Sequence, residues 1–412
     1  MKTALPPSEA VTVDLADPGF LQDPLPVFDQ LREHAPVHWD ERTACWLISR
    51  HEDAAAVLKD RERFGADLHQ ITGYTESRPF GAGSAIEATM EGGYLFKDRP
   101  DHTRLRRVTA ARFTRPQVER EWATAIGRIV EDLLDSITPD QPVDLLRELA
   151  VALPQRVMAA LFQLPQEDAE QLKQWAVDFG HALDPGPSAE QIALAESAAD
   201  GMNRYFLEKA NARYGQPGDD LISMVTAAHQ QGSLRSDAEV VNQLTTIVVA
   251  GTETTSTLIC GAFESLERHP GQWERLRGHP DLVGPAVEEF LRYVSPAALA
   301  GRVALTDVRL GGHTIRKGDA VQVVLMAANR DPDVFENPGA LDIGRSPNPH
   351  LAFGGGIHTC VGSHLARLEA RIVFAKASRR WKRVRVDLDG VRRLGRIGVW
   401  GYGDFPVTVE SA

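Results

Sequence analysis

The sequence predicts a mainly α-helical fold with small peripheral β-sheets, organised around one long central helix. From His102 to Trp381 most segments repeat their apolar residues with a helical period, and prolines separate them. One of these segments starts after Ser236 and meets no proline before Pro270, which allows a helix of about 33 residues. Short alternating stretches occur only between helices and near the ends of the chain, so the sheets are expected at the periphery.

The shorter elements follow in chain order. A short amphipathic helix is expected over Pro24–His34, and the stretch 65–93 is rich in glycine and irregular, which is typical of a functional or mobile loop. No internal repeat and no Gly/Ser linker divides the chain, so we expect a single domain over residues 1–412. The other expected elements are a strand pair at 37–39 and 45–48, a helix at 51–59, short strand-like pieces near 302–310 and 320–325, and strand pairs within 384–409.

Composition excludes several classes of protein. A charged fraction of 25% beside 43% hydrophobic residues is ordinary for a globular protein, and the net charge of −12 argues against general nucleic-acid binding. The three cysteines are far apart, which implies no disulfide framework and fits a reducing compartment. The segment Met1–Pro24 has no apolar core of signal-peptide length, and no stretch is apolar enough to span a membrane. We therefore expect a cytoplasmic monomer that binds no membrane.

One stretch places a cysteine between a glycine-rich loop and the start of a helix. It runs from Phe353 to Gly362 around Cys360, and the helical pattern Ser363–Trp381 follows directly. Consecutive glycines allow a tight loop, and the free N–H groups at a helix start favour a thiolate. A thiolate held in this way suits a soft metal centre such as heme iron. The alternative is a buried free cysteine.

The central helix carries unusual polar residues. Ser236 and Glu239 form a capping-box pattern at its start, and 244–250 is apolar or Thr on every side, which predicts burial all round. Glu253 and Thr254 then follow Ala250 and Gly251, although an acid is a poor choice for a core helix. For the neighbouring Thr252 and Thr255, the alternative is a hydrogen bond back to a carbonyl one turn earlier.

The stretch around Cys360 resembles the heme-binding signature of the cytochromes P-450, and the resemblance covers nearly the whole chain from about Asp23. It implies that the protein binds heme b and that Cys360 is the thiolate ligand of the iron. Phe353 would shield the sulfur and His358 would reach a heme propionate. Gly354 and Gly362 complete the motif around the cofactor.

The central helix carries a second part of the resemblance. The run from Ala250 to Thr255 is similar to the family's oxygen-activation sequence, which implies that Ala250 and Gly251 lie against the cofactor. Gly251 would permit a local widening of the helix. The resemblance further implies that Thr254 hydrogen-bonds dioxygen and that Glu253 relays protons from solvent.

Other segments match the family's scaffold and its cofactor anchors. Glu289 and Arg292 resemble the Glu-x-x-Arg brace, but Ala340 stands where the family often has a third, arginine arm, so Arg345 or a backbone group is expected to substitute. Residues that resemble propionate anchors are His102, Arg106 and Arg302, with His350 as a further candidate. The alternative for each is an exposed basic side chain. Residues expected to line the substrate pocket are Thr246, Val249, Ala297, Ala298, Leu299 and Trp400. Trp400 and Tyr402 could add aromatic walls to this pocket. The alternative is that both belong to a strand pair in the core or at the surface.

The resemblance implies a heme-thiolate monooxygenase. It would insert one atom of molecular oxygen into a small or mid-sized, largely apolar organic substrate of specialised metabolism or catabolism. Electrons would come from NAD(P)H through a ferredoxin and a ferredoxin reductase, since no flavin or iron–sulfur module is evident.

A basic docking face on an otherwise acidic chain would favour an acidic ferredoxin. The arginines expected to form it are Arg107, Arg112 and Arg115 on one helix, with Arg367 and Arg371 behind Cys360. The alternative is that these arginines balance helix ends and neighbouring acids such as Glu369.

Two other functions stay open. The same cofactor could catalyse oxidative coupling or another radical reaction. A heme- or zinc-binding protein without turnover is the non-enzymatic alternative. The residues that suggest zinc are His350, His358, Cys360 and His364, although structural zinc sites usually pair cysteines.

Overall fold

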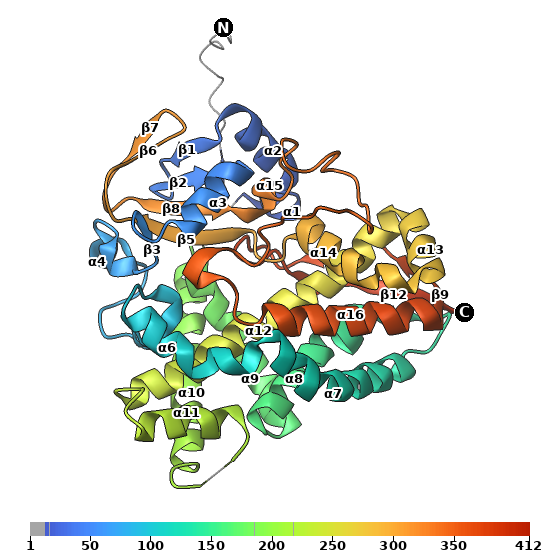
Figure 1. The fold of residues 1–412 in the computed structure, drawn as a ribbon, viewed down its shortest axis with the longest axis horizontal. Helices are drawn as coiled ribbons and strands as arrows, with labels where there is room; N and C mark the ends of the chain where they lie inside the picture. Colours follow the sequence, from blue (N-terminus) through green and yellow to red (C-terminus); the bar gives the residue numbers. More distant parts are fainter. Residues whose placement is uncertain (1–12, 16, 185, 217) are drawn as a thin grey trace, which may run out of the picture.

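The computed structural model describes residues 13–15, 17–184, 186–216 and 218–412. A large helical part and a smaller part rich in β-strands lie side by side (Figure 1). The segment Met1–Pro24 is expected to lack a signal-peptide core. Its first twelve residues, 1–12, lie outside the described residues.

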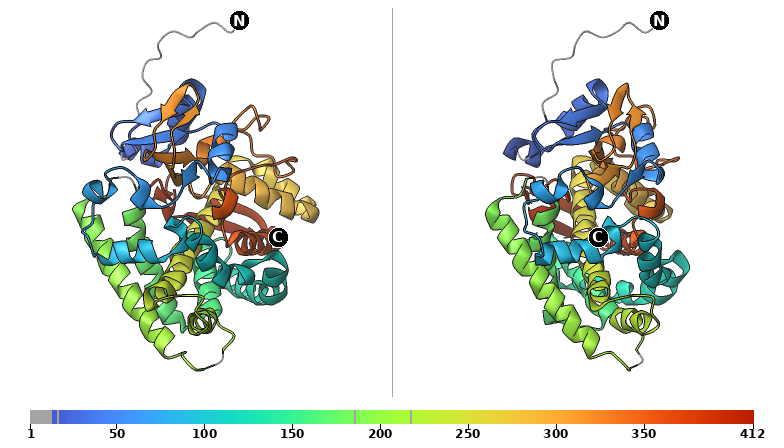
Figure 2. Two further views of the ribbon diagram at one scale, coloured as in Figure 1. Left: turned by 60° about the vertical axis from the view of Figure 1, so that its left-hand side comes forward. Right: turned by 90° about the vertical axis from the view of Figure 1, so that its left-hand side faces the viewer.

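The central helix is confirmed. It is α12 (Asp237–Arg268), with 32 residues, and it runs through the middle of the helical part (Figure 2). The hydroxyl of Ser236 accepts a hydrogen bond from the N–H of Glu239, as a helix cap should. The Glu239 carboxylate, however, accepts from the N–H of Arg235 and binds Arg104, so only one half of the predicted capping box forms.

Helices pack around α12 on several sides, and their buried faces form one large apolar core. The helices of this part are α5 (Ala85–Gly92), α6 (Asp101–Ala110), α7 (Arg115–Ser136), α8 (Ala152–Phe162), α9 (Gln166–Gly180), α10 (Ala189–Asn211), α11 (Leu221–Gln230), α13 (Pro270–Gly278), α14 (Val283–Val294) and α16 (Ser363–Arg380). Short helical turns join them: η2 (Tyr94–Phe96), η3 (Ala111–Phe113), η4 (Leu146–Val151), η5 (His181–Leu183), η6 (Pro280–Leu282) and η7 (Gly356–His358).

The β-rich part is built on a five-stranded sheet of order β1-β2-β8-β5-β3. Its strands are β1 (Val37–Asp40), β2 (Cys45–Ile48), β3 (Phe64–Gly65), β5 (Leu299–Ala304) and β8 (Ala320–Val324), and its helices are α1 (Pro18–Gln22), α2 (Leu25–His34), α3 (His51–Lys59), α4 (Tyr74–Ser77), η1 (Leu68–Gln70) and α15 (Leu325–Ala328). The predicted antiparallel pair of β1 and β2 is confirmed. The short strand-like pieces predicted near 302–310 are confirmed: they are the end of β5 and the first strand of a separate hairpin.

The small sheets lie at the periphery, as predicted. They are the hairpin of β6 (Val308–Leu310) and β7 (His313–Ile315), the sheet of β4 (Pro142–Asp144), β12 (Pro406–Ser411) and β9 (Trp381–Val386), and the pair of β10 (Arg392–Arg393) and β11 (Tyr402–Asp404). The segment 65–93 is less irregular than expected, because it contains α4 and α5, and α5 packs on α12 and α10. Among the described residues, no helix combines the length and apolarity needed to cross a membrane.

Candidate active site

One stripe of α12 is accessible, although the helix is otherwise buried at its middle. The side chains of Thr246, Val249, Ala250, Glu253 and Thr254 are partly or fully accessible. Their spacing of three and four residues places them on one face of the helix. The prediction that 244–250 is buried on every side is therefore wrong, and this stripe presents the acid and the hydroxyl of interest together.

Gly251 permits close packing between helices and does not widen α12. A Cβ atom at this position would collide with the methyl group of Met158 on α8. Because α12 is a regular α-helix along its whole length, the expected widening at Gly251 is wrong. A π-helical turn lies instead at η4, outside α12.

Two threonine hydroxyls near the acid of α12, those of Thr252 and Thr254, bond back to carbonyls one turn earlier. Oγ1 of Thr254 lies 3.0 Å from the carbonyl oxygen of Ala250, and Oγ1 of Thr252 lies 3.2 Å from that of Val248. For Thr252 this bond is the alternative stated above. Thr254, for which the resemblance implies a bond to dioxygen, makes the same type of bond. The two positions differ in access, since Thr252 is buried and Thr254 lies on the accessible stripe.

The acid of the stripe is paired. The Glu253 carboxylate binds the guanidinium of Arg396, which comes from the connection between β10 and β11. The sequence contains no signal for this contact, because the two residues are far apart in the chain and Arg396 belongs to no motif.

The cysteine loop is folded back on itself before α16 begins. The N–H of Cys360 donates to the carbonyl of Phe353 at 2.9 Å, and the N–H of Gly354 donates to that of Leu351 at 2.8 Å. Gly356 has φ +67°, and a Cβ atom there would collide with the carbonyl oxygen of Leu58 in α3. The glycine-rich loop is therefore required for close packing against α3, as the sequence predicts.

Cys360 is an exposed residue, although protein atoms surround its sulfur closely enough to desolvate the thiol in part. This burial raises the pKa of the Cys360 thiol, while the backbone N–H of Gly362, the charges of Arg106 and Arg367, and the N–H of Ser363 act to lower it. The expected donors at the helix start are thus present. They do not by themselves produce the low thiol pKa that the sequence led us to expect, because burial outweighs them.

Two histidines meet beside this loop without partners for their ring nitrogens. The ring centroids of His102, on α6, and His358, in the loop, lie 4.3 Å apart. Both ring nitrogens of His102 and Nε2 of His358 lack hydrogen-bond partners among the described residues, although Nε2 lies 4.0 Å from Oδ1 of Asp98. Burial, then the nearby His358 and Arg106, lower the pKa of His102 to about 4.

Two arginines complete the basic cluster. Arg106 donates to the carbonyls of Ile357, at 3.0 Å, and of Thr359. Arg302, on β5, donates only to the adjacent carbonyl of Gly301 among the described residues, and burial lowers its pKa to about 10.

These side chains fit a bound dianion. After burial, His358 and Arg106 help to lower the pKa of His102. After burial, Arg302 and Arg106 likewise help to lower the pKa of His358, and the carboxylate of Asp98 opposes both shifts. Buried donors without partners are costly, so a group that brings two carboxylates here would satisfy them. The residues therefore fit the two propionates of heme.

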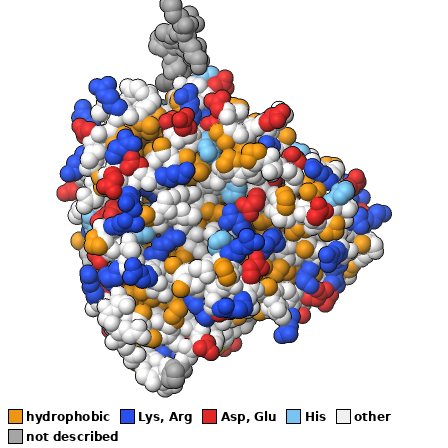
Figure 3. All heavy atoms as spheres, viewed as in Figure 1, with side chains coloured by type: hydrophobic (Ala, Val, Ile, Leu, Met, Phe, Trp, Pro, Cys, Tyr) orange, Lys and Arg blue, Asp and Glu red, His pale blue; other side chains and the backbone are white. Residues whose placement is uncertain are grey.

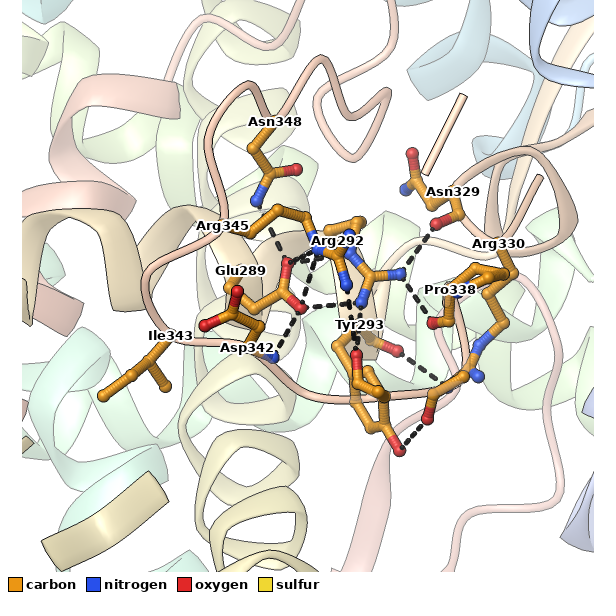
Figure 4. A network of polar contacts seen from close by, with 12 residues as sticks. Glu289, Arg292, Tyr293, Asn329, Arg330, Pro338, Asp342, Ile343, Arg345 and Asn348 are labelled. Atoms are coloured by element: carbon orange, nitrogen blue, oxygen red, sulfur yellow. Dashed lines mark hydrogen bonds and ion pairs between the residues drawn. The ribbon is translucent and has the colours of Figure 1, made fainter. Parts of the chain in front are cut away.

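The predicted brace forms, and its third arm is supplied as expected (Figure 4). Arg292 donates to both carboxylate oxygens of Glu289, at 2.8 and 2.7 Å, and both side chains are fully buried. Nε of Arg345 lies 3.0 Å from Oε2 of the same carboxylate, and the N–H of Asp342 lies 3.0 Å from Oε1. Both the arginine and a backbone group thus replace the arm that Ala340 cannot provide.

The predicted pocket residues divide into two groups. Thr246 and Val249 are accessible on the stripe, and Ala297 and Leu299 are partly accessible beside β5. Ala298 is fully buried in an apolar cluster with residues of α1 and α2, so its assignment to the pocket wall is wrong.

The prediction that Trp400 lines the substrate pocket is also wrong. Its Nε1 donates to the carbonyl of Leu21 at 2.8 Å, and the guanidinium of Arg393 lies 3.5 Å above its ring. The indole is therefore packed between α1 and the C-terminal strands, which agrees with the alternative of a core or surface strand pair. Tyr402 is buried, and its hydroxyl donates to Glu264 at 2.6 Å.

His350 serves the cysteine loop and does not join the basic cluster. Its Nδ1 accepts from the N–H of Ala352 at 3.2 Å, so Nε2 carries the hydrogen that is donated to Glu288 at 3.0 Å. Its candidacy as a propionate anchor is therefore wrong. No group of three or more His, Cys, Asp or Glu side chains that could hold a metal ion occurs in the described part of the chain, which argues against the zinc alternative.

Sequence reasoning missed several residues at the site. Besides Arg396, these are Asp98, whose carboxylate accepts from the N–H of Ala66 at 3.0 Å, and Tyr94, whose ring lies 6.2 Å from that of His102. Burial raises the pKa of Tyr94 to about 12. A cluster of aromatic and charged residues just before the His102–Arg106 motif is the one signal that could have drawn attention to them.

The five arginines of the expected docking face are not equivalent. Arg107, Arg112 and Arg115 do not share one helix, because they lie on α6, η3 and α7. Arg112, Arg367 and Arg371 bind Glu121, Glu288 and Glu119, as the alternative held, whereas Glu369 is buried and binds none of them. Of these five arginines, Arg107 and Arg115 are exposed and have no ion pair among the described residues. Figure 3 shows basic and acidic side chains interspersed over α16 and α7.

Comparison with known proteins matches residues 35–383 to the family model described as Cytochrome P450. A biotin biosynthesis cytochrome P450 of Bacillus subtilis (strain 168) is 35% identical over 397 residues, which cover 96% of this chain and 98% of the relative. The polyketide biosynthesis cytochrome P450 PksS of the same organism is 33% identical over 401 residues, covering 95% and 97%. A crystal structure of P450BioI in complex with an acyl carrier protein that carries hexadec-9Z-enoic acid matches with a TM-score of 0.88 at 34% identity, over 95% of this chain and 99% of that one.

Proposed function

Since the chain belongs to the cytochrome P450 family of heme-binding monooxygenases, we propose that it inserts one oxygen atom from O₂ into a small or mid-sized, largely apolar substrate. The observation that carries this proposal is the accessible stripe of α12, which presents Glu253 and Thr254 beside apolar neighbours. A protein that only stores or carries heme would need neither side chain there.

The proposed ligand of the heme iron is Cys360. Its support is the loop that holds the residue just before α16, with the N–H groups of Gly362 and Ser363 directed at the sulfur. His102, His358, Arg106 and Arg302 would hold the propionates. The ring nitrogens of His102 and Nε2 of His358 have no hydrogen-bond partner among the described residues. The recorded hydrogen bonds of Arg106 and Arg302 go to backbone carbonyls, so an anion would be a stronger partner for both. When bound, the heme supplies the redox-active iron at which dioxygen is activated.

The chain's own residues would manage protons and exclude water. The hydroxyl of Thr254 now donates to the carbonyl of Ala250, and rotation about χ1 would let Oγ1 present its proton to the accessible side of α12. Glu253, one residue earlier on the same stripe, would accept a proton from solvent at a carboxylate oxygen and return it to Oγ1.

The substrate would lie against an apolar wall with few polar groups. Thr246 and Val249 on α12, with Ala297 just before β5 and Leu299 at its start, are partly accessible and offer one hydroxyl among them. Such a wall selects by shape and apolar area more than by hydrogen bonds. We propose a substrate from biosynthesis, because relatives are named for biotin and polyketide biosynthesis.

Electrons would come from NAD(P)H through a separate ferredoxin and its reductase. Arg107 and Arg115, exposed near the thiolate side, support docking of an acidic ferredoxin. The positive electrostatic potential at this face comes less from the other three arginines, because each is already paired with a glutamate. These are Arg112, Arg367 and Arg371.

A substrate panel followed by isotope labelling tests the function. Candidate acyl and polyketide compounds are titrated against the ferric protein, and the low-spin to high-spin shift identifies ligands. The panel includes acyl chains that are free and chains linked to a carrier protein, because a related structure holds such a carrier. Turnover under ¹⁸O₂ with a surrogate ferredoxin system should place one labelled atom in the product. Substrate consumption without label would contradict oxygen insertion and favour oxidative coupling.

A further inference from the structure

Glu288, on α14, holds two side chains that flank the ring of Phe353 in the cysteine loop. Its carboxylate accepts hydrogen bonds of 2.7 and 2.9 Å from the guanidinium of Arg367, on α16. It also accepts one of 3.0 Å from Nε2 of His350. The guanidinium lies 4.4 Å from the centroid of the Phe353 ring, and the centroid of the His350 ring lies 6.2 Å from it. One carboxylate therefore fixes both neighbours of this aromatic ring.

The positive charge of Arg367 lies close to the proposed iron ligand. The carbonyl of Phe353 accepts the N–H of Cys360 at 2.9 Å, so the stacked ring belongs to the residue that is hydrogen-bonded to the ligand. Arg106 and Arg367 both act on the sulfur of Cys360 through their charges. Arg106 is expected to face a propionate, whereas Arg367 faces Glu288. The positive electrostatic potential on the α16 side of the sulfur therefore depends on Glu288.

The ion pair of Glu288 and Arg367 is present at neutral pH. Although burial acts to raise the pKa of Glu288, hydrogen bonds from His350 and Arg367 keep it at about 2, so the carboxylate is ionised at pH 7. His350 is neutral in this arrangement, because its Nδ1 accepts from the N–H of Ala352. These three side chains together carry no net charge. Both partners of the pair are partly accessible, so water screens their charges in part.

We propose that Glu288 is a positioning residue that keeps the reduction potential of the bound heme iron low, because it holds and neutralises Arg367 beside the cysteine loop. This inference rests on the proposed role of Cys360 as the iron ligand. One-electron reduction of the iron adds one negative charge to the site, and no bond is made or broken. An unneutralised guanidinium near the sulfur would stabilise that added charge and favour reduction.

Equilibrium redox titration of the heme-loaded protein, without any electron-donor protein, tests the proposal. Glu288→Gln removes the negative charge and keeps the shape of the side chain, so it should raise the equilibrium constant for reduction by about threefold to tenfold. A tenfold change corresponds to about 59 mV for a one-electron couple. Arg367→Met removes the positive charge and leaves the carboxylate, so it should shift the potential in the opposite direction by a similar amount. Arg367→Gln is the second variant if Arg367→Met does not bind heme.

The double variant Glu288→Gln/Arg367→Met separates charge from structure. Each single substitution removes the same contact, so a merely structural role predicts shifts of the same sign. A charge effect predicts opposite signs in the single variants and a potential near that of the wild type in the double variant. An unchanged potential in Glu288→Gln, or shifts of the same sign in both single variants, would overturn the proposal.

Glu119 and Arg371 provide a matched control. They form the same kind of ion pair, between α7 and α16, but Arg371 lies one helical turn farther from Cys360 than Arg367 does. No contact between Arg371 and the ring of Phe353 is recorded in the described part of the chain. Glu119→Gln should therefore shift the potential much less than Glu288→Gln. Equal shifts would show that loss of any acid near α16 has this effect, and would overturn the assignment to Glu288.

Failure of the proposed iron ligand has a different signature. In that case the red-shifted Soret band of the reduced protein with carbon monoxide would persist in Cys360→His, whatever the potentials of the Glu288 variants. The inference about Glu288 fails alone when Cys360→His loses that band and Glu288→Gln leaves the potential unchanged.

Discussion

The guanidinium of Arg367 lies 4.4 Å above the ring of Phe353, and Glu288 fixes it there with two hydrogen bonds of 2.7 and 2.9 Å. The carbonyl of Phe353 in turn accepts a hydrogen bond from the N–H of Cys360. A carboxylate of α14 thus supports the cysteine loop through an arginine of α16. His350, which binds the same carboxylate, supports the start of the loop.

Removal of this carboxylate should loosen the loop. We expect Glu288→Ala to lower the free energy of unfolding at pH 7 by about 1–2 kcal/mol, because Arg367 and His350 lose a charged partner. Urea unfolding followed by circular dichroism measures this. Burial tends to raise the pKa of Glu288, but hydrogen bonds from His350 and Arg367 outweigh it and hold the pKa at about 2.

The sign of the pH dependence follows from this lowered pKa. The stabilisation is fully present above the ordinary pKa of 4.5 and is lost as the pH falls towards 2. The difference between wild type and Glu288→Ala should therefore shrink in that window. A difference that is constant from pH 7 to pH 3 would contradict the role of the ionised carboxylate.

Thr254 should control the use of electrons. Thr254→Ala should fold and bind heme, but product per electron should fall while peroxide rises, because the proton at Oγ1 is lost. Thr252→Ala is a matched control, since its hydroxyl makes the same type of bond but is buried away from the stripe. Equal coupling in wild type and Thr254→Ala would leave the hydroxyl with its backbone bond as its only role.

Glu253→Gln should slow turnover and change the solvent isotope effect, because an amide cannot carry the proton. It should leave heme content unchanged. Rates and isotope effects equal to those of the wild type would remove Glu253 from the proton path.

Glu369 should make the free energy of unfolding fall as the pH rises from 4.5 towards 8. It is buried in α16, its Oε2 has no hydrogen-bond partner among the described residues, and burial raises its pKa to about 8. Between the ordinary value of 4.5 and 8, the folded protein keeps a proton that the unfolded chain has lost. This group therefore lowers the free energy of unfolding as pH rises, by up to about 1.4 kcal/mol per pH unit.

Glu369→Gln should remove that decline, so its stability relative to wild type should increase from pH 5 to pH 8. Urea midpoints at several pH values measure the trend, with the exposed Glu170→Gln as control. Parallel curves for Glu369→Gln and wild type would show that the carboxyl is ionised throughout.

Reduction by an acidic ferredoxin should depend on Arg115. Arg115→Glu should raise the donor's apparent KM without changing that of the substrate, and reduction should slow as salt rises to physiological strength, where screening acts within roughly 8 Å. Arg112→Glu should have a smaller effect, because Arg112 is paired with Glu121. Arg204→Glu, on α10, is the control. Reduction that is independent of salt would place the docking site elsewhere.

Local patterns predicted those parts of the site that depend on nearby residues. The glycine-rich cysteine loop, the start of α12 at Ser236, and the Glu289–Arg292 pair follow from spacing and from the chemistry of loops and helix caps. The substitution of Arg345 for the missing arm was also foreseeable, because that residue follows Ala340 closely in the chain.

Contacts between distant segments could not be predicted in this way. Arg396 meets Glu253 only because the C-terminal strands fold back over α12, and no local pattern records that return. The burial of Ala298 depends on which face of an extended segment meets the N-terminal core, and a run of small apolar residues does not fix that register. The accessible stripe of α12 likewise depends on what the surrounding helices leave uncovered.

The assignment of Cys360 as the iron ligand is tested most directly by the spectrum of the reduced protein with carbon monoxide. The wild type should show the strongly red-shifted Soret band of thiolate-ligated heme, and Cys360→His should abolish it. Cys45→Ser and Cys260→Ser should keep the band, because both side chains are buried elsewhere. A red-shifted band that persists in Cys360→His would contradict the account.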